Sequence, residues 1–331
     1  MTDYLYHSAR VRALESGIVG RERLDKLLGA DSEEECLALL REFGILPLTD
    51  TESGRFLREE TLLGILRSAY GEIASMAPDE RVLLLWRYPY DCNNVKAAIK
   101  GFVREIDPRS MMFDFGTVDA ETVIGMVQAG DFTGLSEGMA AAAAEAMRVY
   151  AKTKDPQSID LLIDAACYAD MLSAASASGV EPAVELVREK IDLTNLLTTV
   201  RVLRMKNGEN GKALLRESLL RGGKLSHAWL LSQFAAGEDA LWDKLYYTEY
   251  EKLSVLVAAS DKTLTAVERS CDNYLMQTLK EIKYVSFGAE VLIAFLQAHE
   301  YEVRNLRIIL AGKAAGLSVN TIRERIRDSY V

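Results

Sequence analysis

Apolar residues recur every three or four positions along almost the whole chain, and this period limits the fold more than any other feature. In one such segment the apolar positions follow i, i+3, i+4, i+7 and i+8, and they are Val95, Ala98, Ile99, Phe102 and Val103. We find no alternating pattern typical of β-hairpins. The chain has only 6 prolines and 22 glycines in 331 residues, which disfavours folds with many turns. The sequence therefore predicts an all-α protein.

A short motif repeats three times along the chain. It consists of an acidic residue, an asparagine three positions later and then an apolar residue, and a basic residue follows within the next few positions. The three copies contain Asp91 and Asn94, Asp192 and Asn195, and Glu302 and Asn305. The asparagines lie 101 and 110 residues apart, which indicates a repeated unit of about 100 residues.

A second motif resembles a helix start. An apolar residue is followed by Gly, Asp or Ser, and further apolar residues stand five and nine positions after the first. The copies begin at Val19, Val118, Leu225 and Leu317. Because a short side-chain oxygen accepts bonds from the free amides of a first helical turn, three of the second residues are predicted N-caps: Asp119, Ser226 and Ser318.

These motifs divide the chain into three helical repeats, 1–104, 105–212 and 213–331. The helix start at Leu317 makes a partial fourth copy at the C-terminal end. A period near 100 residues is too long for TPR or ankyrin units. We therefore expect three similar helical subdomains arranged around an axis.

The acid–asparagine pairs allow two interpretations. Residues at i and i+3 share a helix face, so each carboxylate could bond the asparagine amide of its own pair. The pairs are then either a repeated ligand or metal site, or polar anchors of a helix crossing. We favour the structural interpretation, because duplication of a packing arrangement would leave three near-equivalent copies.

Residues that form familiar active sites are scarce in the sequence. The only histidines are His7, His227 and His299, and none stands in a metal-binding or catalytic motif. Two carboxylate pairs at i and i+4, which are Asp160 with Asp164 and Glu268 with Asp272, leave a magnesium-dependent helical enzyme as a minor alternative. We otherwise expect no enzyme activity, no cofactor and no metal.

The composition restricts the partners and the compartment. A formal net charge of −10 without a concentrated basic stripe argues against unaided binding to nucleic acid. The four cysteines are widely spaced, which predicts buried, reduced thiols. No signal peptide and no apolar stretch near 20 residues is found, so we expect a soluble chain without a membrane span.

One aromatic stripe is predicted on a single helix. Trp242, Tyr246 and Tyr250 follow i, i+4 and i+8, and Tyr247 stands beside them. Core packing is the favoured explanation, with a protein interface as the alternative.

The chain resembles the C subunit of the archaeal and bacterial A/V-type ATPases, the counterpart of the eukaryotic vacuolar ATPase d subunit. The N-terminal part of the resemblance is the run from Tyr6 to Glu15. The C-terminal part is a series of motifs in order: Val267-Glu268-x-x-x-Asp272-x-Tyr274, Phe287-Gly288-Ala-Glu290, and Glu302-x-x-Asn305-Leu306-Arg307 continued by Gly312-Lys313-x-x-Gly316-Leu317. The resemblance extends over the whole chain.

The resemblance implies a non-catalytic rotor subunit shaped as a funnel of three similar domains about a pseudo-threefold axis. Such a subunit sits on the cytoplasmic face of the membrane, on the proteolipid (c) ring, and receives the central-stalk shaft subunits of the D and F type. It couples ATP hydrolysis or synthesis to proton or sodium-ion transport. The residues that contact these partners are not indicated by the sequence. A free-standing helical scaffold that binds other proteins is the main alternative.

Overall fold

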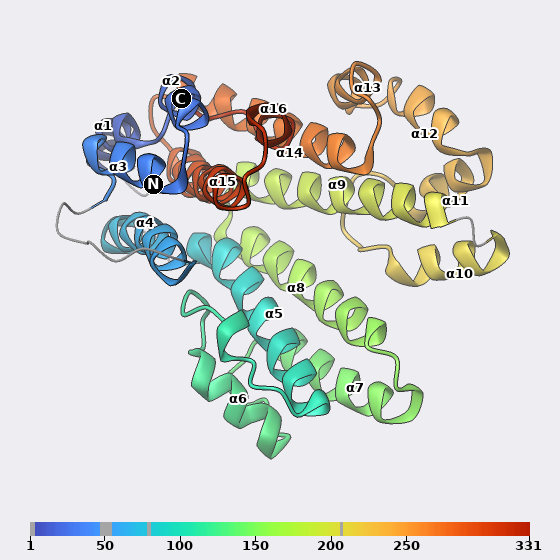
Figure 1. The fold of residues 1–331 in the computed structure, drawn as a ribbon. Coiled ribbons are helices and arrows are strands. Elements are labelled where there is room, and N and C mark those ends of the chain that lie inside the picture. Colours follow the sequence, from blue (N-terminus) through green and yellow to red (C-terminus); the bar gives the residue numbers. More distant parts are fainter. Residues whose placement is uncertain (1–3, 47–54, 78–80, 206–207) are drawn as a thin grey trace. The chain divides into compact units, whose positions relative to one another are not determined.

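The computed structural model describes residues 4–46, 55–77, 81–205 and 208–331, and nearly all of its regular structure is helical (Figure 1). These ranges contain no β-strand, only an isolated bridge between Thr133 and Leu135. The all-α prediction is therefore confirmed. The chain divides into two compact units: unit 1 comprises Met1–Pro78 and Trp242–Val331, and unit 2 comprises Asp79–Leu241. The division into three repeats stays a prediction.

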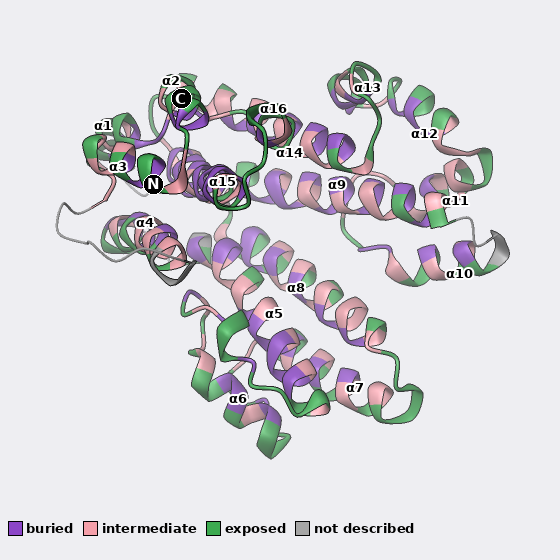
Figure 2. Cartoon of the chain, viewed as in Figure 1, coloured by how far each residue is buried: buried purple, intermediate pink, exposed green. Residues whose placement is uncertain are grey.

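Unit 1 is organised around the 26-residue helix α15 (Ala289–Ala314). Helices packed against α15 come from both ends of the chain: α1 (Leu5–Leu14), α3 (Glu33–Glu42), α4 (Arg55–Met76) and α14 (Leu264–Glu281). The remaining elements are η1 (Glu15–Gly17), α2 (Arg21–Gly29), α13 (Glu251–Ala258), η3 (Ile282–Tyr284) and α16 (Val319–Arg323). Because neighbours surround α15, residues 291–296 in its first half are apolar on all sides and buried (Figure 2).

Unit 2 contains three long helices, α5 (Arg81–Arg104), α8 (Gln157–Ser178) and α9 (Glu181–Met205). α8 packs against both α5 and α9. The shorter elements are η2 (Arg109–Met111), α6 (Ala120–Ala129), α7 (Glu137–Thr153), α10 (Gly208–Ser218) and α11 (His227–Ala236). α12 (Glu238–Leu245) carries the chain from unit 2 into unit 1.

The predicted helix starts are present in the structure. Asp119, Ser226 and Ser318 are N-caps of α6, α11 and α16, and each accepts a bond from the backbone N–H three residues later. These bonds satisfy amides that the first turn leaves free. Gly20 precedes α2 and has no side chain to cap it. The three N-cap predictions are confirmed.

Two expectations about apolar faces need correction. On α5 the predicted face is buried at Val95, Ala98 and Ile99, but Phe102 is 49% exposed because the helix ends at Arg104 and its last turn is uncovered. The aromatic stripe is not continuous either. α12 ends at Leu245, so a turn separates Trp242 and Tyr250, which are both buried.

The other two tyrosines of that region point away from the core. Tyr246 is 45% exposed and Tyr247 is 81% exposed, since both lie in the turn between α12 and α13. The prediction about cysteines is confirmed: all four are buried and none forms a disulfide, and they are Cys36, Cys92, Cys167 and Cys271.

Candidate functional site

The six motif residues lie within the three longest described helices. α5 carries Asp91 and Asn94, α9 carries Asp192 and Asn195, and α15 carries Glu302 and Asn305. All six are at most 5% exposed. A buried polar group is costly unless it is hydrogen-bonded, so the partners of these side chains decide what they do. We call the pairs clamp 1 (Asp91, Asn94), clamp 2 (Asp192, Asn195) and clamp 3 (Glu302, Asn305).

Each asparagine binds both backbone groups of one residue in a later loop. Its Nδ2 donates to the carbonyl oxygen of that residue, and its Oδ1 accepts from the amide N–H. The loop residues are Phe113 for Asn94 (2.7 and 2.9 Å), Leu220 for Asn195 (2.9 and 2.8 Å) and Arg327 for Asn305 (3.0 and 2.9 Å). The side-chain amide therefore supplies the partners that a strand or helix would give this backbone.

The acids of clamps 1 and 2 hold the residues that lead into the next helix. Asp91 Oδ1 accepts from the amides of Thr117 (2.8 Å) and Val118 (3.4 Å), and its Oδ2 accepts from the Thr117 hydroxyl (2.7 Å). Asp192 Oδ2 accepts from the amides of Lys224 (2.7 Å) and Leu225 (3.2 Å). The N-caps of α6 and α11 follow directly, so these carboxylates fix where both helices begin.

Burial raises the pKa of Asp91 above its ordinary value. The bonds from Thr117 and Val118 oppose this shift, because they favour the ionised carboxylate. Desolvation remains the larger influence. The hydrogen bonds therefore hold the carboxylate of clamp 1 in place, although burial destabilises its ionised form.

A glycine allows the close approach of the loop in clamps 1 and 2. A Cβ atom added to Gly116 would lie 2.1 Å from Asp91 Oδ1, and one added to Gly223 would lie 2.1 Å from Asp192 Oδ1. Real Cβ atoms essentially never come this near to another heavy atom. Each glycine stands directly before the amides that the acid binds, so any side chain there would displace the carboxylate.

Clamp 3 uses the same chemistry on the two ends of the chain. Asn305 binds Arg327, four residues before the C-terminal Val331. Glu302 Oε1 accepts from the amide of Val19 at 2.7 Å, and Oε2 lies 2.6 Å from His299 Nδ1. Val19 begins the first helix-start motif, and the Arg21 amide donates to the Val331 carbonyl oxygen at 3.3 Å.

The three acids thus bind successive helix starts in order. Clamp 1 holds the start at Val118, clamp 2 holds the start at Leu225, and clamp 3 holds the start at Val19. The acid of the first predicted repeat therefore binds the second repeat, that of the second binds the third, and that of the third binds the first. The helix start at Leu317 is not held by Glu302 in this way.

The sequence located the clamp residues but did not predict the backbone partners that the structure shows. It suggested that each carboxylate could bond the asparagine of its own pair. The structure gives each asparagine and each acid a separate backbone partner, 19 to 33 residues away in clamps 1 and 2. Loop residues such as Phe113 or Leu220 carry no side-chain signal for this, because only their backbone groups take part.

Two of the three histidines also lie at clamps. His227 Nε2 is 2.8 Å from the Leu220 carbonyl oxygen, which Asn195 of clamp 2 also binds. His299 lies beside Glu302, as described above. His7 lies on α1, where its ring makes edge-to-face contacts with Tyr4 and Tyr6.

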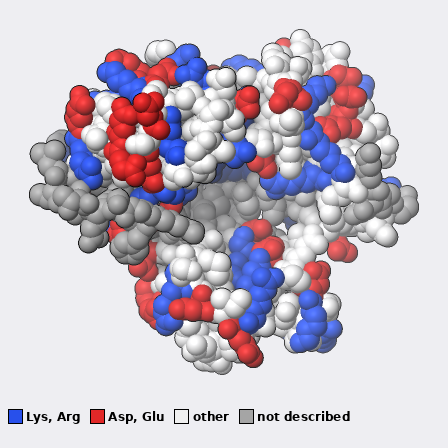
Figure 3. Space-filling view, in the orientation of Figure 1, with Lys and Arg blue, Asp and Glu red and all other residues white. Residues whose placement is uncertain are grey.

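Three of the four carboxylates considered as magnesium ligands are paired with cations of the protein itself. Asp160 pairs with Lys100 at 2.5 Å and Asp164 pairs with Lys96 at 2.6 Å. Basic and acidic side chains lie side by side in several places on the face shown in Figure 3. In the second pair, Asp272 contacts Arg304, Arg327 and Tyr301. Within the described ranges, no three His, Cys, Asp or Glu residues are grouped so that they could hold a metal ion.

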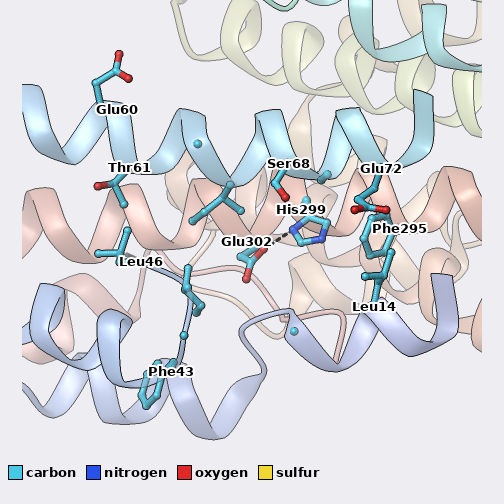
Figure 4. A pocket seen from close by; sticks show the side chains of 16 residues that line it. Leu14, Phe43, Leu46, Glu60, Thr61, Ser68, Glu72, Phe295, His299 and Glu302 are labelled. Atoms are coloured by element: carbon cyan, nitrogen blue, oxygen red, sulfur yellow. Dashed lines mark hydrogen bonds and ion pairs between the residues drawn. The ribbon is translucent and has the colours of Figure 1, made fainter. Parts of the chain in front are cut away.

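A cavity of ≈560 Å³ lies in unit 1 beside clamp 3 (Figure 4). Its walls come from α4, from α15 and from the N-terminal segment that includes Leu14, Gly17 and Phe43. His299 and Glu302 both line it, and Glu72 on its wall is paired with Arg10 at 2.5 Å. No sequence motif indicated this cavity, because its walls come from three separate stretches of the chain.

Among the described residues, no helix combines the length and the apolar character needed to cross a bilayer.

The chain is similar in sequence to a known protein family. The model of the family described as "ATP synthase (C/AC39) subunit" matches residues 7–325. The C subunit of the A-type ATP synthase of Haloferax volcanii is 25% identical over 97% of this chain and 96% of its own length. That of Methanocaldococcus jannaschii is 24% identical over 98% and 86%. The C subunit of the V-type sodium ATPase of Enterococcus hirae is 24% identical over 77% of each chain.

Proposed function

The chain belongs to the ATP synthase (C/AC39) subunit family, and from this premise we propose that it is a non-catalytic rotor part of an A/V-type ATPase. In this proposal it joins the central shaft to the proteolipid ring of the membrane sector. Rotation passed through it couples ATP hydrolysis or synthesis to the transport of protons or sodium ions. It lies on the cytoplasmic face of the membrane as a peripheral subunit, and its partners are the ring and the D-type and F-type shaft subunits.

The observation that carries this proposal, beyond family membership, is the return of clamp 3 to the N-terminal segment. Head-to-tail links between like units close into a ring when the last unit binds the first. Clamps 1, 2 and 3 provide such links in order, ending on Val19. This supports the expected arrangement of three repeats about a pseudo-threefold axis, with an opening that receives a shaft.

The chemistry of the clamps suits a part that transmits torque. Each clamp buries polar side chains whose bonds to backbone are satisfied, and satisfied buried networks make a structure rigid and specific. Close-packed helices yield little under load. The clamps fix the start of each following helix, so a force applied to one repeat reaches the next without loosening the loop between them.

We propose no catalytic step for this chain. Asp160 and Asp164 are neutralised by lysines of α5, and Asp272 is bound to two arginines. A magnesium ion would have to displace these cations before it could use the carboxylates. The ion pairs instead favour a role in holding helices together.

Affinity purification from native membranes tests the proposal. A tagged chain, solubilised in mild detergent, should copurify with the proteolipid ring and with both shaft subunits. Deleting its gene should abolish ATP-driven ion uptake by inverted vesicles, and the restored gene should recover it. Copurification with neither ring nor shaft would reject the rotor role and favour the free-standing scaffold.

The affinity of the chain for the purified shaft subunits provides a second test. The net charge of −10 suggests that electrostatic attraction to a basic shaft contributes to docking. Affinity should then fall as salt rises, because a Debye length of about 10 Å at 0.1 M shrinks to about 3 Å at 1 M. An affinity independent of salt would contradict the electrostatic part of the proposal while leaving the rotor role intact.

A further inference from the structure

We infer that the link closed by clamp 3 is the weakest of the three and is where the set of repeats opens first. We call this link the seam, meaning the contacts of residues 18–21 with clamp 3 and with Val331. Opening it releases residues 18–21 from clamp 3 and from Val331 without unfolding a helix. The inference concerns the isolated chain and does not depend on the rotor role.

The first reason is chain connectivity. The residues that clamps 1 and 2 bind through their acids lie 26 to 33 positions further along the chain, so an opened loop stays close to its clamp. Val19 lies 283 positions from Glu302. The chain itself therefore tethers an opened loop to clamps 1 and 2 much more closely than it tethers Val19 to Glu302.

The second reason is the number of bonds that each acid makes to the backbone. Asp91 accepts from two amides and a hydroxyl, and Asp192 accepts from two amides. Glu302 accepts from a single backbone amide, that of Val19, and its other oxygen faces His299. The acid of clamp 3 therefore holds fewer backbone groups than either of the other acids, and the second amide bond of the seam, from Arg21 to the Val331 carbonyl oxygen, is long at 3.3 Å.

The third reason is packing. The ≈560 Å³ cavity is lined by both His299 and Glu302, and by Gly17, two residues before Val19. Figure 4 shows the His299–Glu302 pair among the side chains that line this space. Atoms that face a cavity lack contact partners on that side, so their environment is less stabilised than a close-packed one.

Two side chains outside the seam also join the N-terminal and C-terminal parts of unit 1, and they are Lys313 and Arg12. Lys313 Nζ on α15 donates to the carbonyl oxygens of Leu28 (2.7 Å) and Ala30 at the end of α2. Arg12 on α1 donates to the carbonyl oxygens of Ile282 (2.6 Å) and Val285 (2.9 Å). Lys313 provides the simpler test, because Lys313→Met keeps the apolar stem and removes only the donor.

Residue-resolved hydrogen exchange on the full chain measures the three links with the same kind of bond. The amides of Val19, Thr117 and Lys224 each donate to a clamp acid, so their protection factors are directly comparable. We expect the factor of Val19 to be roughly tenfold or more below the other two, as for a locally opening segment. Equal or greater protection at Val19 would overturn the inference.

The variant Lys313→Met sharpens the test, with Lys96→Met as its matched control. Lys313→Met should lower protection at Val19 several-fold further and leave Thr117 and Lys224 unchanged. Lys96→Met removes a donor to Asp164 between α5 and α8, far from the seam in sequence, and should leave Val19 unchanged. A uniform change at all three amides, or none, after Lys313→Met would count against a separate seam. The wild-type comparison decides the question even if a variant fails to fold.

Discussion

Clamps 1 and 2 in unit 2 and clamp 3 in unit 1 use the same residue types for different purposes. In unit 2 both members of a clamp bind residues that follow them in the chain, so the clamp shapes a loop and the helix after it. In unit 1 the asparagine binds the C-terminal segment and the acid binds the N-terminal segment, so the clamp joins two ends. Side-chain chemistry alone does not decide between shaping and joining; the connectivity of the chain does.

The largest effect is expected from removing an asparagine. Asn195→Leu leaves the buried N–H of Leu220 without its partner, which costs about 1–3 kcal/mol, and it removes one of the two bonds to the Leu220 carbonyl oxygen, where His227 remains. Asn94→Leu and Asn305→Leu should cost less, because the groups they release are partly buried. Thermal unfolding should show a fall of several degrees, greatest for Asn195→Leu.

The neighbouring asparagine on α5 provides the control. Asn93 Nδ2 donates to the Met111 carbonyl oxygen at an exposed position, where water can replace it, so Asn93→Leu should change melting little. Unchanged melting of Asn195→Leu or Asn305→Leu, together with lost ATP-driven ion transport, would contradict the structural role of the clamps.

A smaller effect, and one that separates the two kinds of clamp, is expected from glycine substitutions. Gly116→Ala and Gly223→Ala place a methyl group against Asp91 or Asp192, and such overpacking typically costs about 1–3 kcal/mol. No glycine near the seam approaches Glu302 in this way: a Cβ on Gly20 would meet Val331 at 3.2 Å, and a Cβ on Gly17 would meet nothing within 4 Å. Gly17→Ala should therefore leave unfolding by urea nearly unchanged. Equal loss in all three variants would show that clamp 3 is as tightly enclosed as the others.

The sequence predicted the parts of the fold that side-chain patterns encode. Helical periodicity predicted the all-α class, and short polar residues before apolar runs predicted the N-caps at Asp119, Ser226 and Ser318. Repetition drew attention to the six clamp residues. The division at 104 and 212 and the pseudo-threefold funnel stay proposals.

The rest depended on backbone groups and on distant segments. Asn94 binds the N–H and C=O of Phe113, which every residue except proline possesses, so the loop sequence gives no indication of this partner. Glu302 and Val19 lie at opposite ends of the chain, and no periodic pattern connects them. The cavity beside clamp 3 escapes prediction for the same reason.

The smallest expected effect concerns pH. It tests whether burial destabilises the ionised form of the acid of clamp 1. Burial raises the pKa of Asp91 above its ordinary 3.8, so the folded state binds the proton more tightly than the unfolded state. Its contribution to stability is then fully present below the ordinary value and is lost as pH rises through the raised pKa. Stability of the wild type relative to Asp91→Asn should fall across that window, with a slope of at most about 1.4 kcal/mol per pH unit for one proton.

Asp119 supplies a control of opposite sign, two residues beyond the Thr117 amide that Asp91 holds. Bonds from Thr122 lower the pKa of its capping carboxylate, so that contribution is present above the ordinary value and is lost as pH falls through the lowered pKa. Urea unfolding of wild type, Asp91→Asn and Asp119→Asn between pH 3 and 7 should therefore give difference curves that slope in opposite directions. Parallel curves would mean that the clamp acid behaves as an ordinary cap. Clamp 1 would then fix its loop without the cost that burial of the charge implies.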